Sequence, residues 1–176
     1  VHVLLEAFQG LLARGHQPAP RLRIHGNLSW FPDYVRQLRS QLEGDAVEFL
    51  GEFDNQDALQ IYAGIDVLVV PSVWWENSPT TMHEAMLTGT PIIASNFGGM
   101  ADLVREGENG LLFQVDDAAD LQRKMESLLQ DPARLEELRG PGVPVKTIER
   151  DAADMEQRYL ELLRAPAVAQ ASMSGA

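Results

Sequence analysis

Hydrophobic residues recur along the chain at two different periods, and the two periods alternate. Short apolar or alternating runs at residues 21–25, 47–50, 66–70, 91–95 and 110–113 predict β-strands. Residues 1–14, 32–42, 55–63, 79–88, 99–105, 118–130 and 132–139 carry the helical period. Strands that alternate with helices in this way predict βαβ units, and therefore a doubly wound α/β fold with a mostly parallel sheet.

The same pattern divides the chain. We predict one domain over residues 1–144, a C-terminal helix over 145–164 and a disordered tail over 165–176. The helix at residues 1–14 has an apolar stripe that needs a sheet to cover, yet no strand precedes it here. In a Rossmann strand order that strand is central, between those at 21–25 and 66–70. We therefore expect either an interrupted sheet beside these two strands or a filling segment from elsewhere.

Composition excludes several classes of function. The formal net charge of -12 makes the surface a poor partner for nucleic-acid phosphates or anionic lipid. The chain has no Cys, so it has no disulfide, thiolate metal site or Cys nucleophile, which fits a cytoplasmic location. Its four His residues show no metal-ligand spacing.

Residues 71–95 carry the candidate chemistry because they begin at the carboxyl end of a predicted strand, where α/β proteins bind ligands. Ser78 suits a helix N-cap, and Pro79 suits the first helical position. Thr80 and Thr81 then fall in the first turn, whose unpaired N–H groups can bind a diphosphate.

Two glutamates flank this helix start. Glu84 lies about one turn further in, and a carboxylate can accept hydrogen bonds from a vicinal diol such as a ribose. Glu76 precedes the helix and can face the same cleft. The alternative interpretation is that both are solvated surface residues, since an acidic chain places two Glu at this spacing by chance. The strand–loop–helix–strand context favours the functional interpretation.

The segment resembles glycosyltransferase family 4, whose members have the GT-B fold of two Rossmann-like domains. The matching residues are Pro71-Ser72, Glu76, Glu84-Ala85-Met86, Gly89-Thr90-Pro91, Phe49-Leu50-Gly51, Gly98-Gly99, Asp102-Leu103-Val104, Gly107 and Asn109–Phe113. The resemblance covers roughly residues 1–164 and implies a Rossmann-like, C-terminal, donor-binding half. It also implies a retaining transfer from a UDP- or GDP-sugar to an acceptor hydroxyl, with no metal and no other cofactor.

The resemblance implies a role for each matching position. Glu76 would contact hydroxyls of the transferred sugar at the catalytic centre, and Glu84 would bind the ribose. The backbone at Asn77, Ser78, Pro79, Thr80 and Thr81 would hold sugar and diphosphate. The strand end from Gly51 to Phe53 would line the nucleobase, and Gly26 would open a loop beside the donor.

The chain also departs from the family pattern. Asn77-Ser78-Pro79 replaces the common x-Phe-Gly after the first Glu. The family's upstream Arg and Lys, which neutralise the diphosphate, and its N-terminal acceptor domain are not in these residues. We therefore expect the chain alone to be inactive and the acceptor to bind mainly elsewhere.

Two other interpretations stay open: a non-catalytic nucleotide-sugar-binding module, and another Rossmann-type nucleotide binder. The second is disfavoured because no Gly-x-Gly-x-x-Gly follows the first strand. Among nearby residues, we predict that Trp74 and Trp75 pack in the interior. We predict that Asp116, Asp117 and Asp120 charge a helix start and bind no metal.

Overall fold

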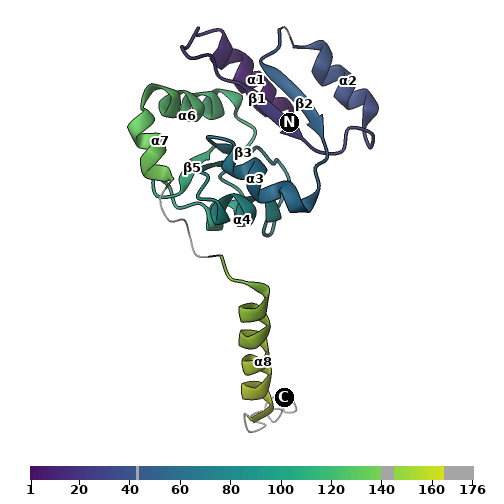
Figure 1. The fold of residues 1–176 in the computed structure, drawn as a ribbon, viewed down its shortest axis with the longest axis vertical. Helices are drawn as coiled ribbons and strands as arrows, with labels where there is room; N and C mark the ends of the chain where they lie inside the picture. The colour runs from purple at the N-terminus through teal and green to yellow at the C-terminus, as the bar shows by residue number, and fades with distance from the viewer. Residues whose placement is uncertain (43, 140–144, 165–176) are drawn as a thin grey trace, which may run out of the picture. The chain divides into compact units, whose positions relative to one another are not determined.

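The computed structural model describes residues 1–42, 44–139 and 145–164, and the chain divides into two compact units, Val1–Pro144 and Val145–Ala176. The predicted loop at 140–144 and the predicted tail at 165–176 lie outside the described residues. Figure 1 shows the elements of the first unit, which alternate as predicted. They are α1 (His2–Leu12), β1 (Leu22–His25), α2 (Pro32–Ser40), β2 (Val47–Gly51), the 3₁₀ helix η1 (Asn55–Asp57), α3 (Ala58–Ala63), β3 (Leu68–Val70), α4 (Thr80–Leu87), β4 (Ile92–Ser95), α5 (Gly99–Leu103), β5 (Gly110–Phe113), α6 (Ala118–Gln130) and α7 (Pro132–Leu138).

All strand pairs in the first unit are parallel. β1 pairs with β2 in one sheet, and β3, β4 and β5 form a second sheet in that order. Parallel strands joined by helices confirm the predicted α/β, Rossmann-like fold. The centre of the larger sheet is β4, in which Ile92, Ala94 and Ser95 have no exposed surface.

The core lies between the larger sheet and two helices that pack together, α1 and α6. α1 turns its stripe inward because its apolar residues recur at helical spacing. The core cluster contains Val3, Leu4, Ala7, Ile93, Leu111, Phe113, Leu121, Leu128 and Leu138.

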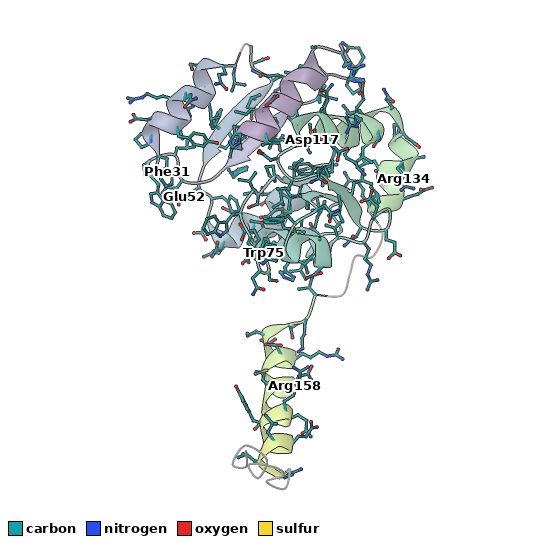
Figure 2. The ribbon with its side chains drawn as sticks, turned by 180° about the vertical axis from the view of Figure 1, so that it is seen from behind. Phe31, Glu52, Trp75, Asp117, Arg134 and Arg158 are labelled. Atoms are coloured by element: carbon teal, nitrogen blue, oxygen red, sulfur yellow. The ribbon has the colours of Figure 1, made fainter. Side chains whose placement is uncertain are left out.

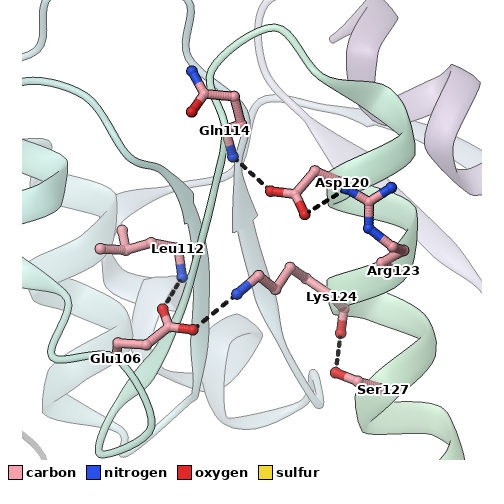
Figure 3. A network of polar contacts seen from close by, with 7 residues as sticks. All are labelled: Glu106, Leu112, Gln114, Asp120, Arg123, Lys124 and Ser127. Atoms are coloured by element: carbon pink, nitrogen blue, oxygen red, sulfur yellow. Dashed lines mark hydrogen bonds and ion pairs between the residues drawn. The ribbon is translucent and has the colours of Figure 1, made fainter.

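Carboxylates link α6 to the outer edge of β5 through hydrogen bonds and an ion pair (Figure 3). Glu106 accepts a hydrogen bond from the Leu112 N–H and forms an ion pair with Lys124, at 2.9 Å between Oε1 and Nζ. Asp120 accepts a hydrogen bond from the Gln114 N–H at 2.7 Å. Asp117 caps α6 through the Asp120 N–H, so the predicted helix-start role of these aspartates is confirmed.

The structure corrects two predicted helix starts. Helix α4 begins at Thr80, with Pro79 at the N-cap, because the ψ of Pro79 is 121° and therefore extended. The region 55–63 begins as a 3₁₀ turn, and Asp54 caps it by accepting from the Gln56 N–H. At α4 the residue after the predicted cap took the cap position, and at residues 55–57 the first turn is 3₁₀, since helix ends are decided only weakly by local propensity.

The sheet is interrupted between β1 and β3, as the sequence predicts, because no ladder joins these strands among the described residues. A groove of about 490 Å³ runs between them, with apolar residues from α1, β3 and α6 in its walls. The strand β3, predicted to be covered on both faces, is only partly buried. Its open side toward the groove explains the difference.

The second unit contains helix α8 (Ile148–Arg164). Lys146 pairs with Asp151 at 2.7 Å and with Asp154 at 3.0 Å, and these hydrogen bonds raise the pKa of Lys146. Met155, Tyr159, Leu162 and Leu163 of α8 recur at the helical spacing that predicts a packing face, but they are exposed in the structure. Across the part of the chain that the structure describes, no helix is long and apolar enough to cross a bilayer.

Candidate functional site at the carboxyl edge of the strands

The loop after β3 holds Glu76 in a fixed place. The Ser72 hydroxyl donates to Glu76 Oε1 at 3.2 Å, and the Glu76 N–H donates to the Trp74 carbonyl at 2.9 Å. The Glu76 carbonyl accepts from the Gly99 N–H at 2.8 Å, which ties the loop to the start of α5. Because three contacts hold the residue, the half-buried Glu76 side chain is presented from an ordered loop.

Two glycines let α5 approach this loop at backbone contact. A Cβ on Gly99 would lie 1.6 Å from the Asn77 carbonyl oxygen, and one on Gly98 would lie 2.7 Å from the Glu76 carbonyl oxygen. Gly98 also has a φ of 56°, which favours glycine. The pair therefore acts on the site by positioning the Glu76–Asn77 backbone.

An aromatic contact adds to this clamp. Trp75, labelled in Figure 2, meets Phe97 edge to face at 4.7 Å between ring centroids. The prediction that the tryptophans pack in the interior is nevertheless wrong, because Trp74 is 75% and Trp75 68% exposed. The loop leaves the sheet at its edge, so its apolar residues have no core to enter.

The start of α4 presents backbone donors, although its cap differs from the predicted one. The Ser78 hydroxyl lies 2.7 Å from His83 Nε2 and makes no cap bond. Thr80 and Thr81 occupy the first turn and are exposed, whereas the Met82 N–H already donates to the Pro79 carbonyl. Free N–H groups at a helix start suit an anionic ligand.

Glu84 lies half-buried on α4 beside the buried Tyr62 of α3. Burial, together with a hydrogen bond and charge repulsion from the Glu84 carboxylate, raises the pKa of the Tyr62 phenol. Thr90 Oγ1 donates to the Tyr62 carbonyl at 2.8 Å and fixes the backbone of Tyr62. Tyr62 therefore lies beside Glu84, although the two residues are 22 positions apart and no motif in the sequence indicates the contact.

We expect Tyr62→Phe to reduce the free energy of unfolding at neutral pH by about 1–2 kcal/mol, the worth of one hydrogen bond to a carboxylate. A tyrosine whose pKa is raised in the folded state contributes stability below its unfolded pKa of about 10, and this contribution is lost as the pH rises further. Melting temperatures should therefore fall more steeply above about pH 10 for the native chain than for Tyr62→Phe. Tyr159→Phe on α8 is the control, and equal pH slopes for the native chain and Tyr62→Phe contradict the assignment.

The residues predicted to line the nucleobase, together with Gly26, form a second group at the ends of β1 and β2. The Gly26 N–H donates to the Gly51 carbonyl at 2.9 Å, and both glycines have positive φ with open space around their Cα atoms. Phe53 meets His25 edge to face at 5.2 Å and Tyr62 at 6.4 Å between centroids. His25, Phe53 and Tyr62 thus form a row of aromatic contacts from the end of β1 to the neighbourhood of Glu84.

The structure therefore links the predicted residues in two sets. In one set Gly26 bonds to Gly51, and Phe53 contacts Tyr62, which lies beside Glu84. In the other set Glu76 and Asn77 contact α5. Residues 78–81 join the two sets along the chain. Among the described residues, no group of three or more His, Asp or Glu side chains could hold a metal ion.

The chain is similar in sequence to one known protein family and to several of its members. Residues 1–131 match the family described as "Glycosyl transferases group 1". D-inositol 3-phosphate glycosyltransferase of Rhodococcus opacus is 36% identical over 138 residues, which are 76% of this chain and 31% of that protein. The chain thus spans about a third of the length of this relative.

Solved structures share the fold. Anabaena HepE, crystallised with UDP and glucose, matches with a TM-score of 0.71 and 26% identity over 92% of this chain and 44% of that one. The C-terminal domain of the group 1 protein LpcC from Francisella tularensis matches with a TM-score of 0.68 and 18% identity over 88% of this chain and 77% of that one.

Proposed function

Because this chain belongs to the group 1 glycosyl transferases, we propose that it supplies the donor-binding half of a retaining glycosyltransferase of family 4. Its substrate would be a UDP- or GDP-sugar, and its product a glycoside of an acceptor hydroxyl. The observation that carries the proposal is the arrangement at α4, where Glu76, the helix start and Glu84, which lies beside Tyr62, follow one another. The UDP complexes of Anabaena HepE support a nucleotide donor.

We assign each part of the nucleotide-sugar donor to residues of this site. Glu84 accepts hydrogen bonds from the ribose diol, and Phe53 with Gly51 lines the nucleobase. Gly26, where a side chain is absent and the φ is positive, leaves room for the loop beside the donor. Glu76 faces hydroxyls of the transferred sugar, held by Ser72 and α5.

In this proposal the chain contributes to the reaction by stabilising the charge that develops on the leaving diphosphate. The bond between the anomeric carbon and the diphosphate oxygen breaks as the acceptor oxygen bonds to the same face of that carbon. Negative charge grows on the leaving diphosphate oxygen, and this oxygen takes up the proton that the acceptor hydroxyl gives up. The N–H groups of Thr80 and Thr81 stabilise that charge, since fixed donors in a partly dry site cost no reorganisation.

The acceptor binds mainly to residues outside this chain in this proposal, and the chain alone shows no transferase activity. The length of a relative supports this division, since the residues that match this chain make up 31% of that protein. The second candidate function is a nucleotide-sugar-binding module without catalysis. The enzyme is favoured because both glutamates of the family pattern, Glu76 and Glu84, are present in the chain.

Ligand-dependent melting tests the proposal. UDP or GDP at about 100 times its dissociation constant stabilises the folded chain by about 2.7 kcal/mol, which is a rise of several degrees. We expect one of these nucleotides and its sugar conjugate to raise the melting temperature, and NAD to leave it unchanged. A shift with NAD alone, or with none of them, contradicts the donor site.

We expect Glu76→Gln to separate sugar binding from nucleotide binding. The substitution keeps the size of the side chain and the hydrogen bond from Ser72 but removes the charge. In the full-length enzyme, turnover should fall by about 100-fold or more, as for a lost transition-state contact. Calorimetry should show unchanged affinity for free UDP or GDP. Equal losses for nucleotide and nucleotide sugar contradict this division of roles, and Ser72→Ala is the companion variant with the milder defect.

A further inference from the structure

His25 ends β1 at the carboxyl edge of the sheet, where α/β proteins bind ligands, and it lies beside a residue assigned to the nucleobase. Its ring meets Phe53 edge to face at 5.2 Å between centroids, with 86° between the ring planes. Phe53 in turn contacts Tyr62, which lies beside Glu84. The imidazole therefore continues the row of residues that we assign to the ribose and the base.

The backbone around His25 is open enough for a planar ring to approach. The register of β1 and β2 shifts at this point, so that His25 pairs with Gly51 and the pairing skips Leu50. A shift of this kind turns nearby side chains to a new direction and is common next to functional sites. At Gly26 and Gly51 nothing lies within 4 Å of the place that a Cβ would take. A base can therefore come close to the backbone beside the imidazole without meeting a side chain there.

The two ring nitrogens of His25 differ in their surroundings. Nδ1 is buried and has no hydrogen-bond partner among the described residues. Nε2 is neither buried in this way nor hydrogen-bonded within that part of the chain, and the residue as a whole is half-buried. A neutral imidazole carries one proton, and its surroundings decide which nitrogen holds it. Because an unpaired buried N–H is rarer and costlier than an unpaired acceptor, neutral His25 carries its proton on Nε2.

Packing alone does not account for a histidine at this position. A phenylalanine would make the same edge-to-face contact with Phe53 and would bury no unpaired nitrogen. The polar atom that histidine adds on the accessible side of the ring is the Nε2–H donor. The structure therefore offers one hydrogen-bond donor, on a ring fixed by Phe53, beside the open backbone at Gly26 and Gly51.

We propose that His25 selects the nucleobase by donating its Nε2–H to a carbonyl oxygen of the base. The carbonyl is O4 of uracil or O6 of guanine, the bases of the two proposed donors. Cytosine and adenine carry an amino group at the corresponding position, so their N–H groups would face the N–H of His25 and leave both donors unpaired. This inference rests on the proposed function and makes His25 the residue that distinguishes a carbonyl base from an amino base.

Calorimetry with two pairs of nucleotides tests the proposal. UDP with CDP, and GDP with ADP, each contrast a carbonyl base with an amino base. In the native chain we expect the carbonyl member of one pair to bind at least about 10-fold more tightly, the effect of one well-placed hydrogen bond. His25→Phe keeps a ring against Phe53 but removes the donor. It should weaken binding of the carbonyl nucleotide by about 10-fold and bring the ratio close to one.

Two further variants separate the donor from the shape of the ring. His25→Gln is the rescue variant, because a side-chain amide offers both a donor and an acceptor. It should restore much of the affinity for UDP or GDP and also admit CDP or ADP, since the amide can turn its oxygen toward the amino group. His16→Phe is the matched control, because His16 bonds to Glu126 at 3.2 Å instead. It should leave the base preference unchanged.

NMR correlation of the imidazole nitrogens with their ring protons needs no variant. At about pH 8, where histidine side chains are ordinarily neutral, we expect the His25 proton on Nε2. The Nε2 signal should move with the carbonyl nucleotide and stay in place with its amino counterpart. A proton on Nδ1, equal binding of both members of a pair, or a His25→Phe variant that keeps the native preference overturns this inference alone. If neither UDP nor GDP binds the native chain, the donor site itself is wrong and the role of His25 is overturned with it.

Discussion

Gly99→Ala is expected to displace the Glu76–Asn77 loop and to lower both the stability of the chain and its affinity for a nucleotide sugar. The new Cβ would lie 1.6 Å from the Asn77 carbonyl oxygen and 3.2 Å from that of Glu76. Both contacts are with backbone, which cannot rotate away, so the loop or α5 must move. Overpacking of this kind costs about 2 kcal/mol or more, and a lateral shift of about 1 Å at a reacting group can cost about 100-fold in turnover.

Thermal unfolding, calorimetry with the nucleotide sugar and turnover of the full-length enzyme measure these effects. For a chain of this size, about 2 kcal/mol lowers the melting temperature by roughly 4–8 °C. Gly110→Ala is the matched control, because its Cβ would lie 2.1 Å from the Ile92 carbonyl oxygen inside the sheet. It should destabilise the chain without a selective loss of sugar binding.

Gly10→Ala is the mild control, since its Cβ would meet only the end of the Gln122 side chain. If Gly99→Ala matches Gly10→Ala in both stability and affinity, the close approach of α5 does not position the site.

Glu84→Ala is expected to weaken nucleotide binding by about 1.5–3 kcal/mol, which is roughly 10- to 150-fold in the dissociation constant. The half-buried carboxylate lies beside Tyr62 of α3, and in this proposal it accepts hydrogen bonds from the ribose diol. Isothermal calorimetry with UDP or GDP, whichever stabilises the native chain, measures the loss. Unchanged affinity in a folded variant would sink the assignment of the ribose to Glu84.

A double-mutant cycle separates the role of Tyr62 from simple packing. If Tyr62 acts through Glu84, Tyr62→Phe weakens nucleotide binding in the native background and has little further effect beside Glu84→Ala. Additive losses show that the two residues act independently. Glu137→Ala on α7 controls for removing one negative charge from an acidic chain.

The sequence alone determined the order and type of most elements. The bounds of β5 and α6 agree with the predicted 110–113 and 118–130, because a strong apolar period and an Asp cap mark them. The loop from Pro71 to Pro79 was also located in advance, since it follows an apolar strand and carries a dense string of family residues. The interruption between β1 and β3 also agrees with the expectation from the sequence, in which the apolar stripe at residues 1–14 needs a sheet to cover.

The tertiary structure decided the features that depend on contacts between distant parts of the chain. Three such features are the contact of Tyr62 with Glu84, the approach of Gly99 to Asn77 and the exposure of Trp74, which depend on how α3, α5 and the loop pack. The helix start moved to Thr80 because Pro79 took an extended ψ while Ser78 bonded to His83. Periodicity reports which face of an element is buried, but not which partner covers it, so such contacts are settled only when the elements pack together.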